Sequence, residues 1–259
     1  MKPRIACVYV LAIAVFVQVT RADVKDGQPW WPCFHGPQRD NVSRETGLMK
    51  TWPDGGPKLV WKYTSVGLGY SGVSIAEGKV FTAGDFDDGE KVIALGLEGN
   101  LVWETVNGES WTGPYPGSRT TPSYSDGVLY QMNPTGRLAA LRADTGKEAW
   151  IVDLREKFGA RYGVWAMSEN VAVEGNLVFC IPGGGDALMV ALDKTTGTTV
   201  WVNDKLDETA AYCSPIIVTH RGRRQLIALT QRSIVGVDVA DGKLLWSHPH
   251  VTRGDQNVN

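Results

Sequence analysis

Cysteine and histidine are scarce in this 259-residue chain, which holds four of each. No two cysteines are adjacent, and His35, His220, His248 and His250 show neither a metal-ligand spacing nor the pattern of a catalytic triad. Lys and Arg number 26 against 28 Asp and Glu, so there is no basic surplus that would favour nucleic-acid binding. We therefore expect no metal site, no catalytic residue set and no nucleic-acid partner.

Long apolar runs are also missing, except at the N-terminus. Lys2 and Arg4 precede an apolar stretch at residues 5–17, which predicts a secretory signal peptide at residues 1–22 that is cleaved before Asp23. The stretch is short for a bilayer span, although an uncleaved membrane anchor remains the alternative. Cys7 lies in the stretch without a lipid-attachment context. We expect a secreted or periplasmic mature chain without a membrane span.

Three cysteines remain after this cleavage, namely Cys33, Cys180 and Cys213. Because three is an odd number, at most one disulfide can form within the chain. We expect buried free thiols, and a disulfide between Cys180 and Cys213 is the open alternative.

One sequence phrase recurs along the chain. Residues 188–201 read LMVALDKTTGTTVW, an apolar run followed by a turn and a β-branched run that ends in Trp. Val and Thr favour strands, and Asp193 and Gly197 favour a tight turn between them. Residues 92–103, 138–150 and 234–246 repeat this antiparallel pair. In each copy a glycine precedes a tryptophan by four residues: Gly99 and Trp103, Gly146 and Trp150, Gly197 and Trp201, and Gly242 and Trp246.

The spacing of the repeat indicates the fold. Trp61 ends a fifth, shorter copy, and the five tryptophans are 42, 47, 51 and 45 residues apart. Repeats of about 40–50 residues with strand content are typical of the four-stranded blades of β-propellers. Residues 73–76, 122–125, 171–173 and 214–218 are the candidate innermost strands. Since one blade cannot bury both faces, blades must stack on each other, and we expect the tryptophans to fill the interfaces.

The sequence therefore predicts an all-β chain with an irregular, proline-rich segment at residues 23–57 that lies over a partial propeller at residues 58–259. The propeller has four blades and one orphan N-terminal strand ending at Trp61. The 13 residues after Trp246 are too few to supply three more strands, so we expect an incomplete ring. The chain would then be a fragment of a longer propeller, or an arc that a partner chain completes.

The repeats resemble those of the pyrroloquinoline-quinone-type (PQQ-like) β-propeller family. Residues 191–201 carry the pattern A-L-D-x-x-T-G-x-x-x-W, and residues 34–41 and 114–122 resemble phrases of its secreted bacterial subgroup related to outer-membrane assembly. Phe34 and His35 depart from the Trp-Arg of the first phrase. The resemblance implies a propeller, but the family includes both quinone-dependent dehydrogenases and non-catalytic scaffolds.

The connectors between blades are the candidate site, because loops on a rigid scaffold usually carry function. They hold aromatic and charged residues, including Trp111, Tyr115, Tyr162, Asp207, Glu208 and Tyr212. Arg119, Arg161, Trp165 and Glu169 are the candidate cofactor-binding residues, since aromatic rings beside arginine could hold a planar anion or a peptide. Loop packing with surface charge is the alternative interpretation.

We expect a non-catalytic binding or scaffold protein that holds a protein or peptide partner on the propeller face. We expect no cofactor, because some quinone dehydrogenases of the family carry a disulfide between adjacent cysteines that this chain lacks, and no calcium site is convincing. The acidic stretch at residues 85–90 departs from an EF-hand loop, and we expect a solvated hairpin there. The alternative function is a PQQ- and Ca²⁺-dependent alcohol or sugar dehydrogenase that uses Trp165 and Glu169.

Overall fold

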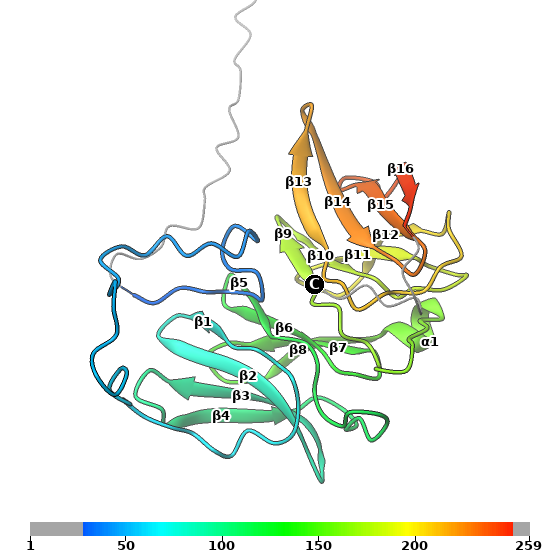
Figure 1. Cartoon of the computed structure of the whole chain (residues 1–259). Coiled ribbons are helices and arrows are strands. Elements are labelled where there is room, and N and C mark those ends of the chain that lie inside the picture. The colour runs from blue at the N-terminus through cyan, green and yellow to red at the C-terminus, as the bar shows by residue number, and fades with distance from the viewer. Residues whose placement is uncertain (1–27, 251–259) are drawn as a thin grey trace, which may run out of the picture.

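The computed structural model describes residues 28–250, and the predicted signal peptide lies outside them. Within this part of the chain, 16 strands form four antiparallel sheets of four strands each, with one short helix. The sheets follow one another in chain order along an arc (Figure 1). This arrangement confirms the all-β fold and the four blades that the sequence predicts.

Each sheet is one blade, in which the strands lie in chain order. Blade 1 contains β1 (Ser74–Ala76), β2 (Lys79–Phe86), β3 (Gly89–Gly96) and β4 (Leu101–Val106). Blade 2 contains β5 (Ser123–Ser125), β6 (Val128–Met132), β7 (Arg137–Arg142) and β8 (Glu148–Asp153), followed by α1 (Leu154–Phe158). Blade 3 contains β9 (Ala172–Glu174), β10 (Leu177–Cys180), β11 (Met189–Asp193) and β12 (Thr199–Asn203). Blade 4 contains β13 (Ile216–His220), β14 (Arg223–Leu229), β15 (Ser233–Asp238) and β16 (Leu244–Pro249).

This strand order places the connections of every blade at two opposite ends of its sheet. We call one end the turn face, which holds the tight turns between first and second strands and between third and fourth strands. We call the other end the connector face, which holds the loops between second and third strands and the connectors between blades at residues 107–122, 154–171 and 204–215. The connectors therefore gather on one face, as expected.

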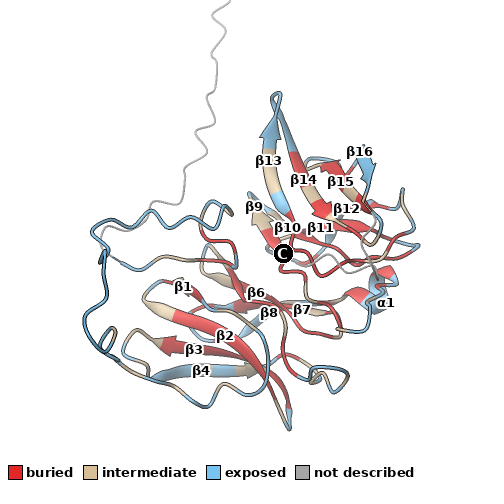
Figure 2. Ribbon diagram, in the orientation of Figure 1, coloured by how far each residue is buried: buried red, intermediate tan, exposed pale blue. Residues whose placement is uncertain are grey.

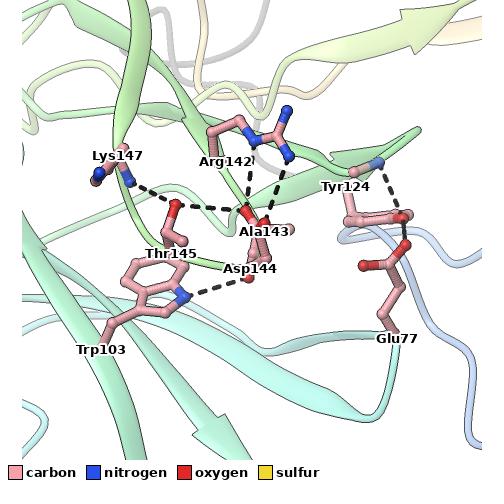
Figure 3. A network of polar contacts seen from close by, with 9 residues as sticks. Glu77, Trp103, Tyr124, Arg142, Ala143, Asp144, Thr145 and Lys147 are labelled. Atoms are coloured by element: carbon pink, nitrogen blue, oxygen red, sulfur yellow. Dashed lines mark hydrogen bonds and ion pairs between the residues drawn. The ribbon is translucent and has the colours of Figure 1, made fainter.

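The repeated tryptophans join each blade to the next at the turn face. Trp103 of β4 donates its indole N–H to the carbonyl oxygen of Ala143, in the β7–β8 turn, at 3.2 Å (Figure 3). The equivalent bonds run from Trp61 to Leu97 at 2.7 Å, from Trp150 to Lys194 at 2.9 Å and from Trp201 to Val239 at 3.0 Å. The prediction that a tryptophan lies at each blade interface is confirmed.

The glycine in the turn between the third and fourth strands of each blade packs against the tryptophan that precedes the blade, and not against the tryptophan of the same blade. Gly146 has a φ of +70°, and a Cβ atom there would lie 2.6 Å from the ring of Trp103. The same contact would measure 2.7 Å between Gly99 and Trp61, 2.8 Å between Gly197 and Trp150, and 2.4 Å between Gly242 and Trp201. Only glycine combines this backbone conformation with so close an approach. The two residue types recur together because every interface needs both.

Inside its own blade, each repeated tryptophan lies opposite a small residue. The cross-strand pairs are Ala94 with Trp103, Ala140 with Trp150, Ala191 with Trp201 and Gly236 with Trp246. In every blade the register shifts directly after this pair. Such a β-bulge bends the outer strand and re-aims its side chains, which orients the ring toward the next blade.

The two ends of the arc depart from the repeat. Residues 58–67 contain no strand, so the expected orphan strand is present only as a segment without a ladder. Trp61 nevertheless occupies the equivalent position over Gly99. Trp246 donates to Oε1 of Gln225 in its own blade, at 2.8 Å, and is 37% exposed.

The core consists of apolar layers between successive sheets. One cluster includes Phe81 and Leu129 from blades 1 and 2, a second includes Leu138 and Val190 from blades 2 and 3, and a third joins blades 3 and 4. Burial is concentrated on the second and third strands of each blade, whereas the outer strands β4 and β16 and the innermost strand β13 of blade 4 are largely exposed (Figure 2). Because each layer needs both of its sheets, stability is shared between neighbouring blades.

The irregular N-terminal segment forms no domain within residues 28–57, but it does more than lie over the blades. Trp31 and Ile75 of β1 exchange two backbone hydrogen bonds of 2.9 and 2.8 Å. The backbone N–H of Tyr124 donates to Pro32, and Trp30 packs edge-on against Tyr124. The segment therefore lines the inner edges of blades 1 and 2.

Two expectations concern the described residues as a whole. Cys33, Cys180 and Cys213 are free and buried, as expected. No helix formed by residues 28–250 has the length and apolar character of a membrane span.

Candidate functional site

A cavity of about 310 Å³ opens on the connector face. Five separate stretches of chain contribute to it, and four of them precede an inner strand, because all inner strands begin at this face. The lining residues are Phe34, Tyr70, Tyr115, Arg119, Trp165, Ser168, Asn170, Tyr212 and Ser214. We call this cavity the connector-face pocket.

One wall of the pocket is aromatic. The ring centroids of Tyr115 and Trp165 lie 6.3 Å apart at an interplanar angle of 77°, and those of Trp165 and Tyr212 lie 5.3 Å apart at 44°. Tyr115, Ala166 and Tyr212 have φ values of +54°, +64° and +64°. Such left-handed conformations cost non-glycine residues on the order of 1 kcal/mol or more and concentrate at functional sites. The surrounding connectors therefore hold this wall in a fixed geometry.

A hydrogen-bonded ladder across the blades runs beside and into the pocket. The N–H of Gly72 donates to Oγ1 of Thr121 at 2.9 Å, and the N–H of Thr121 donates to Oδ1 of Asn170 at 2.6 Å. The N–H of Asn170 donates in turn to Oγ of Ser214 at 3.1 Å. Each of these four residues lies two positions before the inner strand of its blade. The ladder fixes the connectors relative to one another.

Arg119 is the only charged residue among those that line the pocket. Its guanidinium lies 4.9 Å from the ring centroid of Tyr70 and donates through Nη2 to the carbonyl oxygens of Pro114 and Tyr115. Its Nε has no hydrogen-bond partner. Burial lowers the pKa of Arg119, although nearby Tyr70 and Asp85 act in the opposite direction. The side chain is therefore a partly desolvated cation beside aromatic rings.

The structure brings two of the four candidate cofactor-binding residues together in the pocket, Arg119 and Trp165. Glu169 lies outside the lining and is 3% exposed. Its two carboxylate oxygens accept the backbone N–H groups of Tyr212 at 2.6 Å and Ser168 at 3.0 Å. Burial raises the pKa of Glu169, and these hydrogen bonds counteract the rise. The carboxylate thus fixes the connector rather than facing the cavity.

Arg161 lies away from the pocket, in an exposed ion pair with Asp207. Its backbone N–H donates to Pro182 and Gly183, in the β10–β11 loop. The side chain of Arg161 is 50% exposed, so its charge is largely solvated.

Sequence reasoning missed five lining residues: Phe34, Tyr70, Ser168, Asn170 and Ser214. The ladder shows which signal could have found two of them: a short polar residue recurs at one place of the repeat, with bonded positions 49 and 44 residues apart. Tyr70 has no such equivalent. It reaches the pocket because its N–H bonds to Ser118, which brings residues 68–70 alongside the first connector.

The four blades, their tryptophan contacts and the connector-face pocket define a β-propeller repeat protein. Residues 88–259 match a family described as "Outer membrane protein assembly factor BamB". The chain belongs to this family of PQQ-like repeat β-propellers.

Part of the chain is similar in sequence to two kinds of protein, quinoprotein dehydrogenases and outer membrane assembly factors. Quinoprotein alcohol dehydrogenase PedH of Pseudomonas putida is 34% identical over 142 residues, which cover 52% of this chain and 23% of the relative. Outer membrane protein assembly factor BamB of Escherichia coli is 34% identical over 106 residues, which cover 39% of this chain and 25% of the relative. The chain thus spans about a quarter of the length of these relatives.

Among solved structures, BamB from Moraxella catarrhalis superposes with a TM-score of 0.53 at 20% identity. The superposition covers 74% of this chain and 53% of that structure. This similarity supports the propeller architecture. It does not distinguish the function of an assembly factor from that of a quinoprotein dehydrogenase.

Proposed function

We propose that this chain is a secreted or periplasmic, non-catalytic binding protein that holds a polypeptide partner at its connector face. The observation that carries the proposal is the composition of the connector-face pocket. Its lining combines aromatic rings, hydroxyls, one amide and one arginine, without a carboxylate. Such a surface supports recognition rather than acid–base chemistry, which needs a group that can accept a proton close to the substrate.

The alternative is a PQQ- and Ca²⁺-dependent dehydrogenase, which the name of the Pseudomonas putida relative supports. The rings of Trp165 and Tyr212 beside Arg119 suit a planar anion. The pocket does not suit Ca²⁺, which takes six to eight oxygen ligands, usually including carboxylates. Glu169, the carboxylate expected to serve there, uses both oxygens on backbone N–H groups. The lining residues therefore fit the organic group better than the metal that accompanies it.

Incubation of the full chain with PQQ, Ca²⁺ and alcohols or aldoses, with reduction of an artificial dye as the readout, separates the two functions. We expect no dye reduction above the level without protein. Quinone-dependent turnover would overturn the proposal.

Site-specific photo-crosslinking in the source cell gives the positive arm of this test. A benzoylphenylalanine residue at Tyr115, which is 62% exposed on the connector face, should form a discrete cross-link to another polypeptide. The matched control places it at Thr195, an exposed residue of the β11–β12 turn on the turn face. Equal cross-linking from both positions would contradict a connector-face partner.

A further inference from the structure

The apolar surface of the connector face extends beyond the cavity itself. Leu68, Tyr70, Tyr115 and Val164 are 63%, 59%, 62% and 59% exposed. Residues 68–70 pair with Ser118, Arg119 joins Tyr70 to Tyr115, and Val164 adjoins Trp165. Contiguous exposed apolar residues of this kind mark interaction sites. The cavity is near the lower end of the range of about 300–1,000 Å³ for small-molecule pockets. An occupant that fills the cavity and also covers the exposed rim must therefore be larger than a small molecule that fits the cavity alone.

The charge of the site indicates which group the occupant brings. Arg119 is the only charged lining residue, and its Nε lacks a partner. The carboxylate of nearby Asp85 is buried, its Oδ2 accepts the N–H of Trp111 at 2.6 Å, and its Oδ1 has no hydrogen-bond partner; Asp85 and Arg119 form no ion pair. A planar guanidinium matches a carboxylate in both charge and shape. The occupant therefore brings an anion, and a carboxylate fits best.

The charged and aromatic parts of the pocket are neighbours. Arg119 bonds to the carbonyl of Tyr115, and the ring of Tyr115 packs against Trp165. In an extended chain, side chains point to the same side at every second residue, about 7 Å apart. An acidic residue and an aromatic residue separated by one position would therefore face the pocket together.

On the basis of the proposed function, we infer that the connector-face pocket binds an extended polypeptide segment with an acidic residue two positions from an aromatic residue. The carboxylate pairs with Arg119, and the aromatic ring packs against Trp165 and Tyr212. The exposed rim residues cover the backbone of the segment.

The test uses the full chain and short synthetic peptides, with binding followed by titration calorimetry. The probe is acetyl-Gly-Asp-Ala-Phe-Gly-amide, and matched peptides replace Asp by Asn or Phe by Ala, or place Asp and Phe side by side. We expect each change to weaken binding, with the Asp-to-Asn change costing roughly tenfold, as for the loss of a hydrogen-bonded charge. Equal affinity of the Asp and Asn peptides would overturn the assignment of Arg119.

Protein variants locate the effect. In Arg119→Met the Asp and Asn peptides should bind within about twofold of each other, and Arg119→Lys should restore part of the difference, because it keeps the charge without the planar fork. Arg161→Met, which removes an exposed arginine outside the pocket, should keep the wild-type ratio. Loss of the ratio in Arg161→Met would place the carboxylate elsewhere.

Free phenylacetate carries a ring and a carboxylate without a backbone. Binding of phenylacetate as tight as that of the peptide would overturn the polypeptide occupant. These outcomes are separate from dye reduction, so failure of the inference and failure of the proposed function are distinguishable.

Discussion

The turn face and the connector face of this propeller are built by different rules. On the turn face, the same contact between an indole and a glycine turn occurs at four successive places. On the connector face, the connectors differ in length and sequence, and parts of them line one pocket. The comparison indicates that the repeating face supplies stability and the irregular face supplies recognition.

Polar contacts reinforce the regularity of the turn face. In each of blades 1 to 3, an acidic residue at the first turn pairs with the following blade (Figure 3 shows the first pair). The pairs are Glu77 with Tyr124 at 2.5 Å, Asp126 with Lys194 at 2.5 Å, and Glu174 with Arg224. The acidic residue stays in place while its partner changes, so the geometry of stacking matters more than the chemistry of each bond.

Removal of an interface indole should have the largest effect on stability. Trp201 is 7% exposed between blades 3 and 4. Trp201→Ala removes this packing and the bond to Val239, and we expect the free energy of unfolding to fall by about 3–5 kcal/mol. Urea denaturation measures the change. Trp52→Ala is the matched control, because Trp52 is 69% exposed, and it should change stability by less than about 0.5 kcal/mol. Equal losses would contradict the structural role of the repeat.

A comparison of alanine variants at two glycines distinguishes the cost of backbone strain from the cost of a clash with tryptophan. Gly197 and Gly175 both lie in turn-face turns, with φ of +71° and +56°. A Cβ at Gly197 would lie 2.8 Å from Trp150, whereas a Cβ at Gly175 would meet nothing within 4 Å. Both Ala variants bear a strain of about 1–2 kcal/mol, and Gly197→Ala should lose about 1 kcal/mol or more in addition. Similar thermal unfolding of both variants would show that the tryptophan contact does not require glycine.

The blades of the turn face could be predicted from the sequence, because the same contact at every blade interface requires the same residue at the same place of each repeat. Trp103, Trp150 and Trp201 revealed the blades in this way. The sequence did not show that each glycine serves the preceding blade, since that contact joins residues about 40 positions apart. It also did not show that residues 58–67 would form no strand, because a ladder depends on a partner as well as on propensity.

The residues of the connector-face pocket could be predicted only in part, because the connectors that form the pocket do not repeat. Arg119 and Trp165 were candidates by residue type, but the same reasoning also selected Glu169 and Arg161. Whether a side chain faces a cavity depends on the course of each connector, which does not repeat. Glu169 shows the difficulty, because a buried carboxylate suits a site equally well until its backbone partners are known.

A buried glutamate between blades 1 and 2 should make stability depend on pH. The hairpin expected at residues 85–90 forms, but Glu90 is fully buried rather than solvated and lies opposite Asp85. Oε1 of Glu90 accepts bonds from Gln131 and Ser118, whereas Oε2 has no partner. Burial raises the pKa of Glu90 well above its ordinary value of 4.5, and the charge of Asp85 adds to the rise.

The sign of the effect follows from proton binding. Above pH 4.5 the unfolded chain releases the proton of Glu90 while the folded chain retains it, so stability falls as the pH rises through the folded pKa. Glu90→Gln cannot ionise, and we expect it to gain about 1–3 kcal/mol relative to wild type at alkaline pH. Urea denaturation from pH 4 to 9 measures the difference between the two proteins, and Glu109→Gln, at an exposed position, should follow the wild-type curve. A constant difference between Glu90→Gln and wild type would contradict a protonated Glu90.

The smallest expected effect distinguishes the ion pairs of the two faces. Arg224 and Glu174 join blades 4 and 3 on the turn face, with side chains 42% and 35% exposed, and Nε of Arg224 lies 2.8 Å from Oε1 of Glu174. Arg161 and Asp207 pair on the connector face with side chains 50% and 73% exposed. Double-mutant cycles should give a coupling of about 0.5–1 kcal/mol for the first pair and about 0–0.3 kcal/mol for the second, because solvent screens exposed charges. Salt should weaken the first coupling, since it acts across a surface interface. A larger coupling for Arg161 with Asp207 would mean that the connector face also contributes to blade stacking, and the division of roles between the two faces would fail.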